Sequence, residues 1–100
     1  MKKYVKSATG TSYDVYVDLK QAYIHYSVLA DDIEGAYEAA LELAKEDLEV
    51  MYCQPKTAYN VGVSLDGRHT VSFIVPAGSP QEAEKIALQR AVSQMTTSLE

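Results

Sequence analysis

Two similar heptapeptides, YDVYVDL at 13–19 and YNVGVSL at 59–65, constrain the fold of this 100-residue chain more than any other feature. Apolar side chains occupy every second position in both, which predicts strands with one buried face. The likeness continues at an offset of 46 residues in these strands and 47 after the next turn. A one-residue shift is tolerated there because turns absorb insertions. The sequence therefore predicts two pseudo-repeats, 12–50 and 58–95.

Each repeat is predicted to continue through a turn into a second strand. Lys20–Gln21 forms the first turn, and Asp66–Gly67 forms the second, where both residues tolerate positive φ. The returning strands show the same alternation as the first ones. Their buried faces are expected to carry Ile24, Tyr26 and Val28 in the first repeat and Val71, Phe73 and Val75 in the second.

A helix is predicted to end each repeat, over 32–49 and 80–95. In SPQE, Ser79 is the expected N-cap, Pro80 the first helical residue and Glu82 the closing residue of a capping box. In DDIE, Asp31 or Asp32 has the capping role. Small residues on the inward face let each helix lie close to a sheet; these are Ala36, Ala40, Ala44, Ala83, Ala87 and Ala91.

The fold class expected from these elements is α+β, with the order ββαββα in a single domain, 1–100. The most economical packing is one four-stranded, mainly antiparallel sheet with both helices on one face. Right-handed crossovers place the second strands of the two hairpins side by side, giving the order 1-2-4-3 of a permuted ferredoxin-like sheet. Residues 51–57, with Pro55, are expected to be a linker. The alternative is that two chains pair their sheet edges.

Charge and composition exclude several classes of function. Nine Lys and Arg against fourteen Asp and Glu give a net charge of −5, which argues against a broad phosphate-binding surface and hence against direct nucleic-acid binding. A single cysteine forms no internal disulfide, and the basic N-terminus lacks the apolar segment of a secretory signal. No stretch is long enough to span a membrane. We expect a cytoplasmic protein.

No catalytic or cofactor motif is recognisable. The chain has no phosphate-binding glycine loop, nucleophile elbow or metal-spaced histidines or carboxylates. Cys53, His25 and His69 offer a nucleophile and two bases, but nothing in their spacing requires them to meet. The sequence predicts a non-enzymatic protein without cofactor or metal.

The first predicted helix carries an acidic row, Glu34, Glu38, Glu42 and Glu46, that recurs every four residues. Such residues lie above one another on one helix face. Neighbouring like charges cost roughly 0.2–0.5 kcal/mol each, and Lys45 is placed to offset part of this. The second helix lacks such a row. This asymmetry indicates a binding site for a basic partner, although acidic rows are more often only solvated helix faces.

A second candidate contact lies on the sheet face turned away from the helices. If Val15 and Val17 point toward the helices, Tyr16 and Tyr23 point away from them. Tyrosine is favoured at protein interfaces, so we expect Tyr16 and Tyr23 to contact a partner protein or a second copy. Base stacking is disfavoured because Asp14 and Asp18 flank Tyr16.

The segments ADDIEGAYEAALELAKEDL and AGSPQEAEKIALQRA, each after a strand pair, resemble small proteins of phages and mobile elements. Some anti-CRISPR inhibitors are small, acidic and compact in this way. The resemblance rests on a general pattern and identifies no functional residue. It implies an inhibitor that binds and blocks a larger complex in the host cytoplasm, with the acidic row imitating phosphates.

Three functions follow as hypotheses. The first is an interaction module, with inhibition as one form of its action, that docks on a basic, nucleic-acid-binding protein surface through the first helix. The second is a homo-oligomeric structural or assembly protein, in which sheet edges or faces form a dimer. The third is a small-ligand-binding or enzymatic ferredoxin-like domain, for which the sequence offers no acid–base pair.

Overall fold

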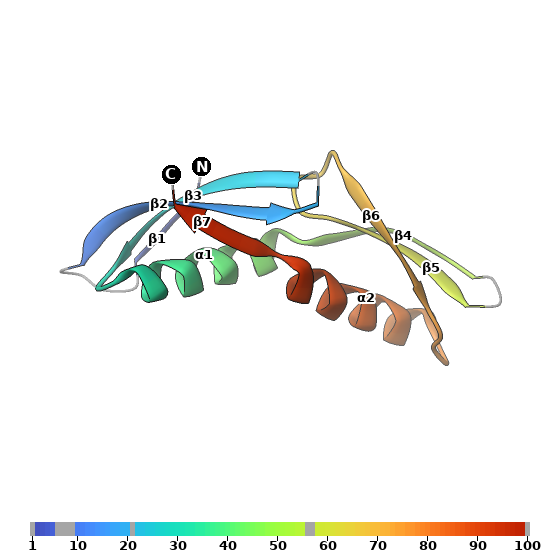
Figure 1. Ribbon diagram of the computed structural model, residues 1–100. Coiled ribbons are helices and arrows are strands. Elements are labelled where there is room, and N and C mark those ends of the chain that lie inside the picture. The colour runs from blue at the N-terminus through green and yellow to red at the C-terminus, as the bar shows by residue number, and fades with distance from the viewer. Residues whose placement is uncertain (1, 6–9, 21, 56–57, 100) are drawn as a thin grey trace.

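The computed structural model describes residues 10–20, 22–55 and 58–99 and the backbone of residues 2–5 (Figure 1). The turn residue Gln21 and linker residues 56–57 lie outside these ranges. The described elements, in chain order, are β1 (Lys2–Val5), β2 (Thr11–Leu19), β3 (Ala22–Ala30), α1 (Ile33–Asp47), β4 (Glu49–Gln54), β5 (Tyr59–Ser64), β6 (Thr70–Val75), α2 (Pro80–Gln94) and β7 (Thr96–Leu99).

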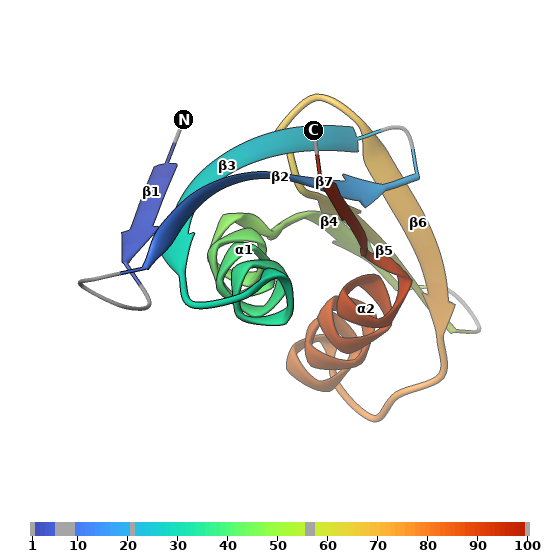
Figure 2. The same cartoon turned by 60° about the vertical axis from the view of Figure 1, so that its left-hand side comes forward.

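The strands form two sheets, so the expectation of one four-stranded sheet in the order 1-2-4-3 is wrong. The first sheet has the order β1-β3-β2-β7 and the second has the order β4-β5-β6. α1 packs on the first sheet and α2 on the second, with both helices on the same side (Figure 2). The expected pairing of β3 with β6 does not form because β1 pairs in parallel with that edge of β3. The α+β class is confirmed.

Each helix is followed by a strand that joins the sheet of the other half. β4 follows α1 and pairs antiparallel with β5, whereas β7 follows α2 and pairs antiparallel with β2. In the first of these pairings Val50 lies opposite Val63. In the second, Thr97 lies opposite Val17, and these residues stand 47 positions after Val50 and 46 positions before Val63. Each half therefore adds its last strand to the sheet of the other half, and the two pairings correspond up to the register shift that β4 has between Val50 and Tyr52.

The predicted linker is wrong over most of its length, because Glu49–Gln54 forms β4. Cys53 therefore belongs to a strand and packs, half-buried, against the core. Residues 49–54 find hydrogen-bond partners on β5. Backbone groups that pair in a ladder are satisfied more fully than in a free linker.

The core lies between the sheets and the helices, as the periodicity predicts. Val15, Val17 and Leu19 of β2 are fully buried, as are Tyr26 and Val28 of β3. The six inward alanines of the two helices are also fully buried: Ala36, Ala40, Ala44, Ala83, Ala87 and Ala91. Their small side chains allow the close approach of helix and sheet that the sequence predicts.

The helix ends show why strands follow the helices directly. Asp32 caps α1 by accepting a hydrogen bond from the Gly35 N–H at 2.7 Å, and Ser79 caps α2 by accepting from the Glu82 N–H at 3.2 Å. Both helices end earlier than predicted. Leu48 and Met95 are already extended, with ψ of 132° and 138°. The chain therefore passes straight into β4 and β7.

Gly62 of β5 lies beneath the ring of Tyr52. A Cβ atom at Gly62 would stand 2.2 Å from Tyr52 Cε2, and the Tyr52 hydroxyl is held by a hydrogen bond with Ser72 on β6. The ring thus crosses β5 and ties together all three strands of the second sheet. Only glycine at position 62 leaves room for it.

Gly62→Ala is expected to lower the free energy of unfolding by about 1–3 kcal/mol, the usual cost of overpacking. Chemical denaturation gives this value. The matched control combines Gly62→Ala with Tyr52→Ala, which removes the ring that the new methyl group would meet. If the Gly62→Ala cost is the same with and without the Tyr52 ring, the contact does not determine the choice of glycine.

Candidate functional site

The acidic row of α1 lies on the exposed face of the helix. Glu34, Glu38, Glu42 and Glu46 are all exposed along a helix of 15 residues, about 22 Å in length. Lys45 Nζ lies 3.2 Å from Glu42 Oε1, with both side chains well exposed. Such surface pairs contribute about 0–1 kcal/mol. The row therefore remains a field of negative charge on the solvent side of α1.

The acidic field extends to the start of α1. A hollow of about 260 Å³ is lined by Asp31, Asp32, Glu34, Gly35 and Glu38. Part of this charge has a structural role, because Asp32 caps the helix and negative charge is favourable near a helix N-terminus. That explanation does not extend to Glu42 and Glu46, which lie in the second half of the helix.

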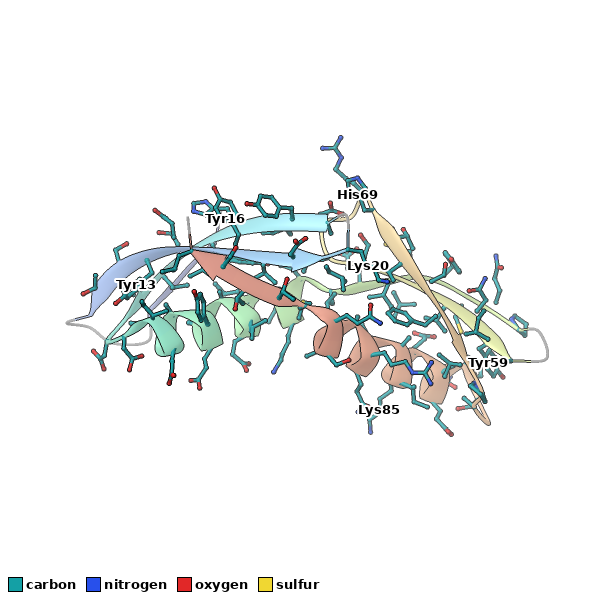
Figure 3. The ribbon with its side chains drawn as sticks, viewed as in Figure 1. Tyr13, Tyr16, Lys20, Tyr59, His69 and Lys85 are labelled. Atoms are coloured by element: carbon teal, nitrogen blue, oxygen red, sulfur yellow. The ribbon has the colours of Figure 1, made fainter. Side chains whose placement is uncertain are left out.

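Position-by-position comparison of the helices isolates the difference between them. α1 and α2 have the same length, and each residue of α1 corresponds to the residue 47 positions later in α2. At the four positions of the acidic row, α2 has uncharged or basic residues, namely Gln81, Lys85, Gln89 and Ser93, all exposed. Lys85 points away from the sheets (Figure 3). The two helices thus share their buried faces and differ in charge on their exposed faces.

A groove lies between the end of α1 and the exposed face of α2. It has a volume of about 680 Å³ and is lined by Lys45, Leu48, Gln81, Glu84, Lys85, Leu88, Gln89 and Val92. The leucines and Val92 are half-buried and supply apolar surface, while two lysines, a glutamate and two glutamines surround it. The sequence alone does not reveal this groove, because its lining residues meet only once the two helices are placed.

Tyr16 lies on the face of the first sheet that is turned away from α1 (Figure 3), and the structure brings the ring of Tyr23 against it. Their rings stack with centroids 4.6 Å apart and planes within 8°. The ring of His25 lies 5.0 Å from that of Tyr16, and His25 Nε2 is 3.1 Å from Asp14 Oδ1. Tyr23 remains 58% exposed. The two tyrosines therefore form one accessible aromatic patch on the face opposite the acidic row.

The three residues considered for nucleophilic chemistry lie in separate settings. Cys53 packs against the core from β4, His25 lies on the outer face of the first sheet, and His69 lies in the turn before β6. His69 Nδ1 is 2.8 Å from Asp66 Oδ2, and His25 is beside Asp14. Among the described residues, no group of three or more His, Cys, Asp or Glu side chains is arranged to hold a metal ion.

Asp66 organises the turn between β5 and β6. Its Oδ1 accepts hydrogen bonds at 2.8 Å from the backbone N–H groups of Arg68 and His69, while Ser64 Oγ accepts one from the Gly67 N–H. Gly67 has φ of 76°, which favours glycine. Partial burial opposes ionisation of Asp66, but the bonds from His69 and Arg68 outweigh it. Together they hold the pKa of the Asp66 carboxyl well below its ordinary value.

Asp66→Asn is expected to lower the free energy of unfolding at pH 7 by about 1–2 kcal/mol, because the turn loses charge-assisted hydrogen bonds. A carboxyl with a lowered folded-state pKa contributes this stability above its unfolded pKa, near 3.8. The contribution disappears as the pH falls from about 4 toward the folded value. Denaturation of both proteins from pH 7 to pH 2 should show a difference that shrinks only below about pH 4. A difference that is constant over this range would contradict the role of the ionised carboxylate.

No family model, curated protein or solved structure matches the chain. Neither described helix is long and apolar enough to cross a membrane.

Proposed function

We propose that the chain is a non-enzymatic interaction module that docks on a basic protein surface through the acidic row of α1. One observation carries the proposal: four exposed positions hold Glu34, Glu38, Glu42 and Glu46 on α1, whereas the equivalent positions on α2 hold no acid. We also infer that the halves are two copies of one ββαβ unit. The acidic row is then a departure confined to one copy.

The packing of the fold does not account for this difference. The equivalent side chains are exposed on both helices, so neither set contributes to the core. A general need for solubility would act on α1 and α2 alike. On α1, adjacent like charges cost roughly 0.2–0.5 kcal/mol each in the free protein. A basic partner surface would convert that cost into favourable electrostatic complementarity.

The chemistry of the row identifies the class of partner. A continuous set of carboxylates matches a surface of lysines and arginines, such as one that binds nucleic-acid phosphates. Occupation of that surface by α1 would exclude the nucleic acid, which makes the module an inhibitor. The resemblance to small phage inhibitors of the anti-CRISPR kind agrees with this proposal.

Tyr16 and Tyr23 form the second contact surface of the proposed module. Their stacked rings lie on the face of the first sheet opposite α1, so a flat surface that covers α1 does not reach them. Exposed tyrosine is favoured in interfaces. We therefore assign the patch to a separate segment of the partner or to a second copy of the chain.

Affinity capture from nuclease-treated lysate of the source cells tests the proposal. Wild type is compared with Glu38→Lys/Glu42→Lys, with Glu82→Lys/Glu84→Lys as a control of equal charge change on α2, and with Tyr23→Ser. We expect a stoichiometric protein with wild type and the α2 control, lost with the α1 variant and released by added nucleic acid. A captured protein that is indifferent to the α1 substitutions would exclude the acidic row as the site.

A further inference from the structure

The outer edge of β6 distinguishes the second sheet from the first. In the first sheet the corresponding edge belongs to β3, and β1 covers it as a parallel strand. In the second sheet β6 pairs with β5 on one side, and among the described residues no strand pairs with its other side. One half of the molecule thus has a covering strand at an edge where the described residues of the other half place none.

β6 also lacks the features that usually protect a sheet edge. Charged residues, short length and bulges discourage pairing with other chains. Each of the other edge strands has at least one: β1 contains Lys2 and Lys3, β4 contains Glu49 and a register shift at Met51, and β7 has four residues. β6 has six residues, no charge, no proline and no register shift against β5. It is therefore suited to accept an added strand.

The open part of the edge lies at the start of β6. Arg90 Nη1 donates a hydrogen bond to the Ile74 carbonyl at 3.1 Å, and from this bond we infer that the backbone groups of Ile74 point away from β5. In an antiparallel ladder alternate residues point to the same side, so the backbone groups of Ser72 and Thr70 also point outward. Arg90 occupies the Ile74 carbonyl, and Pro76 beyond it has no N–H. Thr70 and Ser72 retain outward N–H and C=O groups.

The charges around this edge select the occupant. Lys20 lines a hollow of about 330 Å³ beside Thr70–Ser72, together with His69, whose ring lies against the carboxylate of Asp66 (Figure 3). Arg68 is exposed in the preceding turn and Arg90 lies near the far end, so Lys20, Arg68 and Arg90 outnumber this one carboxylate. A second copy of β6 would bring the same cations against these, and β1 of a second copy would bring Lys2 and Lys3. Charge complementarity therefore favours an acidic segment.

We propose that the edge of β6 at Thr70–Ser72 binds an extended, carboxylate-bearing segment of a partner protein, which joins the second sheet as a fourth strand. Main-chain hydrogen bonds supply the affinity in this mode of recognition, and alternate side chains supply the specificity. Ile74, which is 62% exposed next to this site, offers an apolar contact for one such side chain. The site is separate from the acidic row and does not depend on it.

Two capped eight-residue peptides test the proposal, one alternating Glu with Val and Thr, the other identical except that Lys replaces Glu. Each is titrated into the 15N-labelled protein while the amide signals are followed. We expect the Glu peptide to shift the Thr70 and Ser72 amides and to bind at least tenfold more tightly than the Lys peptide. Lys20→Glu/Arg68→Glu should reverse the preference.

Thr70→Pro removes one outward N–H at the first position of the strand, where proline is tolerated. It should weaken binding of the Glu peptide about tenfold or more, whereas Thr70→Val, which keeps the N–H, should not. Three results would overturn the proposal: no binding of the Glu peptide, equal binding of both peptides, or shifts confined to other surfaces. Concentration-dependent dimerisation through the Thr70 and Ser72 amides would instead assign the edge to a second copy.

Discussion

Replacing Tyr26 with alanine is expected to lower the free energy of unfolding by about 3–5 kcal/mol, the usual cost of removing a buried aromatic ring. Tyr26 is fully buried in β3, and its hydroxyl donates a hydrogen bond to Asp47 Oδ2 at 2.7 Å. Asp47 is the last residue of α1, where a negative charge opposes the helix dipole. Burial, together with the Asp47 carboxylate, raises the pKa of Tyr26 far above its usual range. The hydroxyl therefore remains a hydrogen-bond donor.

Tyr26→Phe separates the ring from the hydroxyl. This variant keeps the packing and removes one donor from Asp47, so we expect a cost of about 1–2 kcal/mol. Chemical denaturation of wild type and both variants gives the two values. A Tyr26→Ala cost below about 1 kcal/mol would show that β3 and α1 are not held together as the structure has them.

Deletion of the residues after Met95, which removes β7, is expected to destabilise the first sheet, although β7 follows α2 in the second half of the chain. β7 pairs four of its residues with Val15–Asp18 of β2. Four antiparallel residue pairs make about four ladder hydrogen bonds, so at roughly 0.5–1.5 kcal/mol for each bond the loss is about 2–6 kcal/mol. Native-state hydrogen exchange should show faster exchange in the β2 amides, while β4, β5 and β6 retain their protection.

A chain that ends at Leu99 is the matched control because it keeps all of β7. It should exchange like wild type. If the chain that ends at Met95 loses protection mainly in the second sheet, or if β2 is unaffected, the exchange of strands between the halves would be wrong.

The elements that the sequence predicts are those with strong local signals. β2, β3, β5 and β6 follow from alternation, and both helices follow from their caps and inward alanines, because these patterns lie within a few residues of one another. β4 and β7 lack such a signal: EVMYCQ and TTSL are short and only partly apolar. They are strands because the edges of β5 and β2 supply hydrogen-bond partners, and those edges are distant in sequence.

The sheet topology also depends on contacts between residues that are distant in sequence, because different strands compete for the same sheet edge. The predicted order placed β3 beside β6, yet residues 2–5 occupy the available edge of β3. Charged residues such as Lys2 and Lys3 do not indicate a strand by periodicity, so the sequence gives no warning of this. The result is two sheets and, within the described part of the chain, a β6 edge on which no strand pairs.

Some features of the candidate site could be predicted from the sequence, whereas others require the folded structure. Exposure of Glu34, Glu38, Glu42 and Glu46 follows from their spacing on one helix face, and the orientation of Tyr16 and Tyr23 follows from strand alternation. The groove between α1 and α2 requires the placement of both helices. Partner binding by the acidic row and the tyrosines stays a prediction.

Calorimetric titration of the captured partner with purified wild type, Glu38→Lys/Glu42→Lys and Glu82→Lys/Glu84→Lys tests the central claim most directly. Thermal melts first establish that all three proteins are folded. We predict that reversal on α1 weakens binding about 100-fold or more, near 2.8 kcal/mol at 1.4 kcal/mol per tenfold, since like charges then face each other. The α2 control should change affinity less than about threefold. Equal affinities for all three proteins would contradict docking through α1.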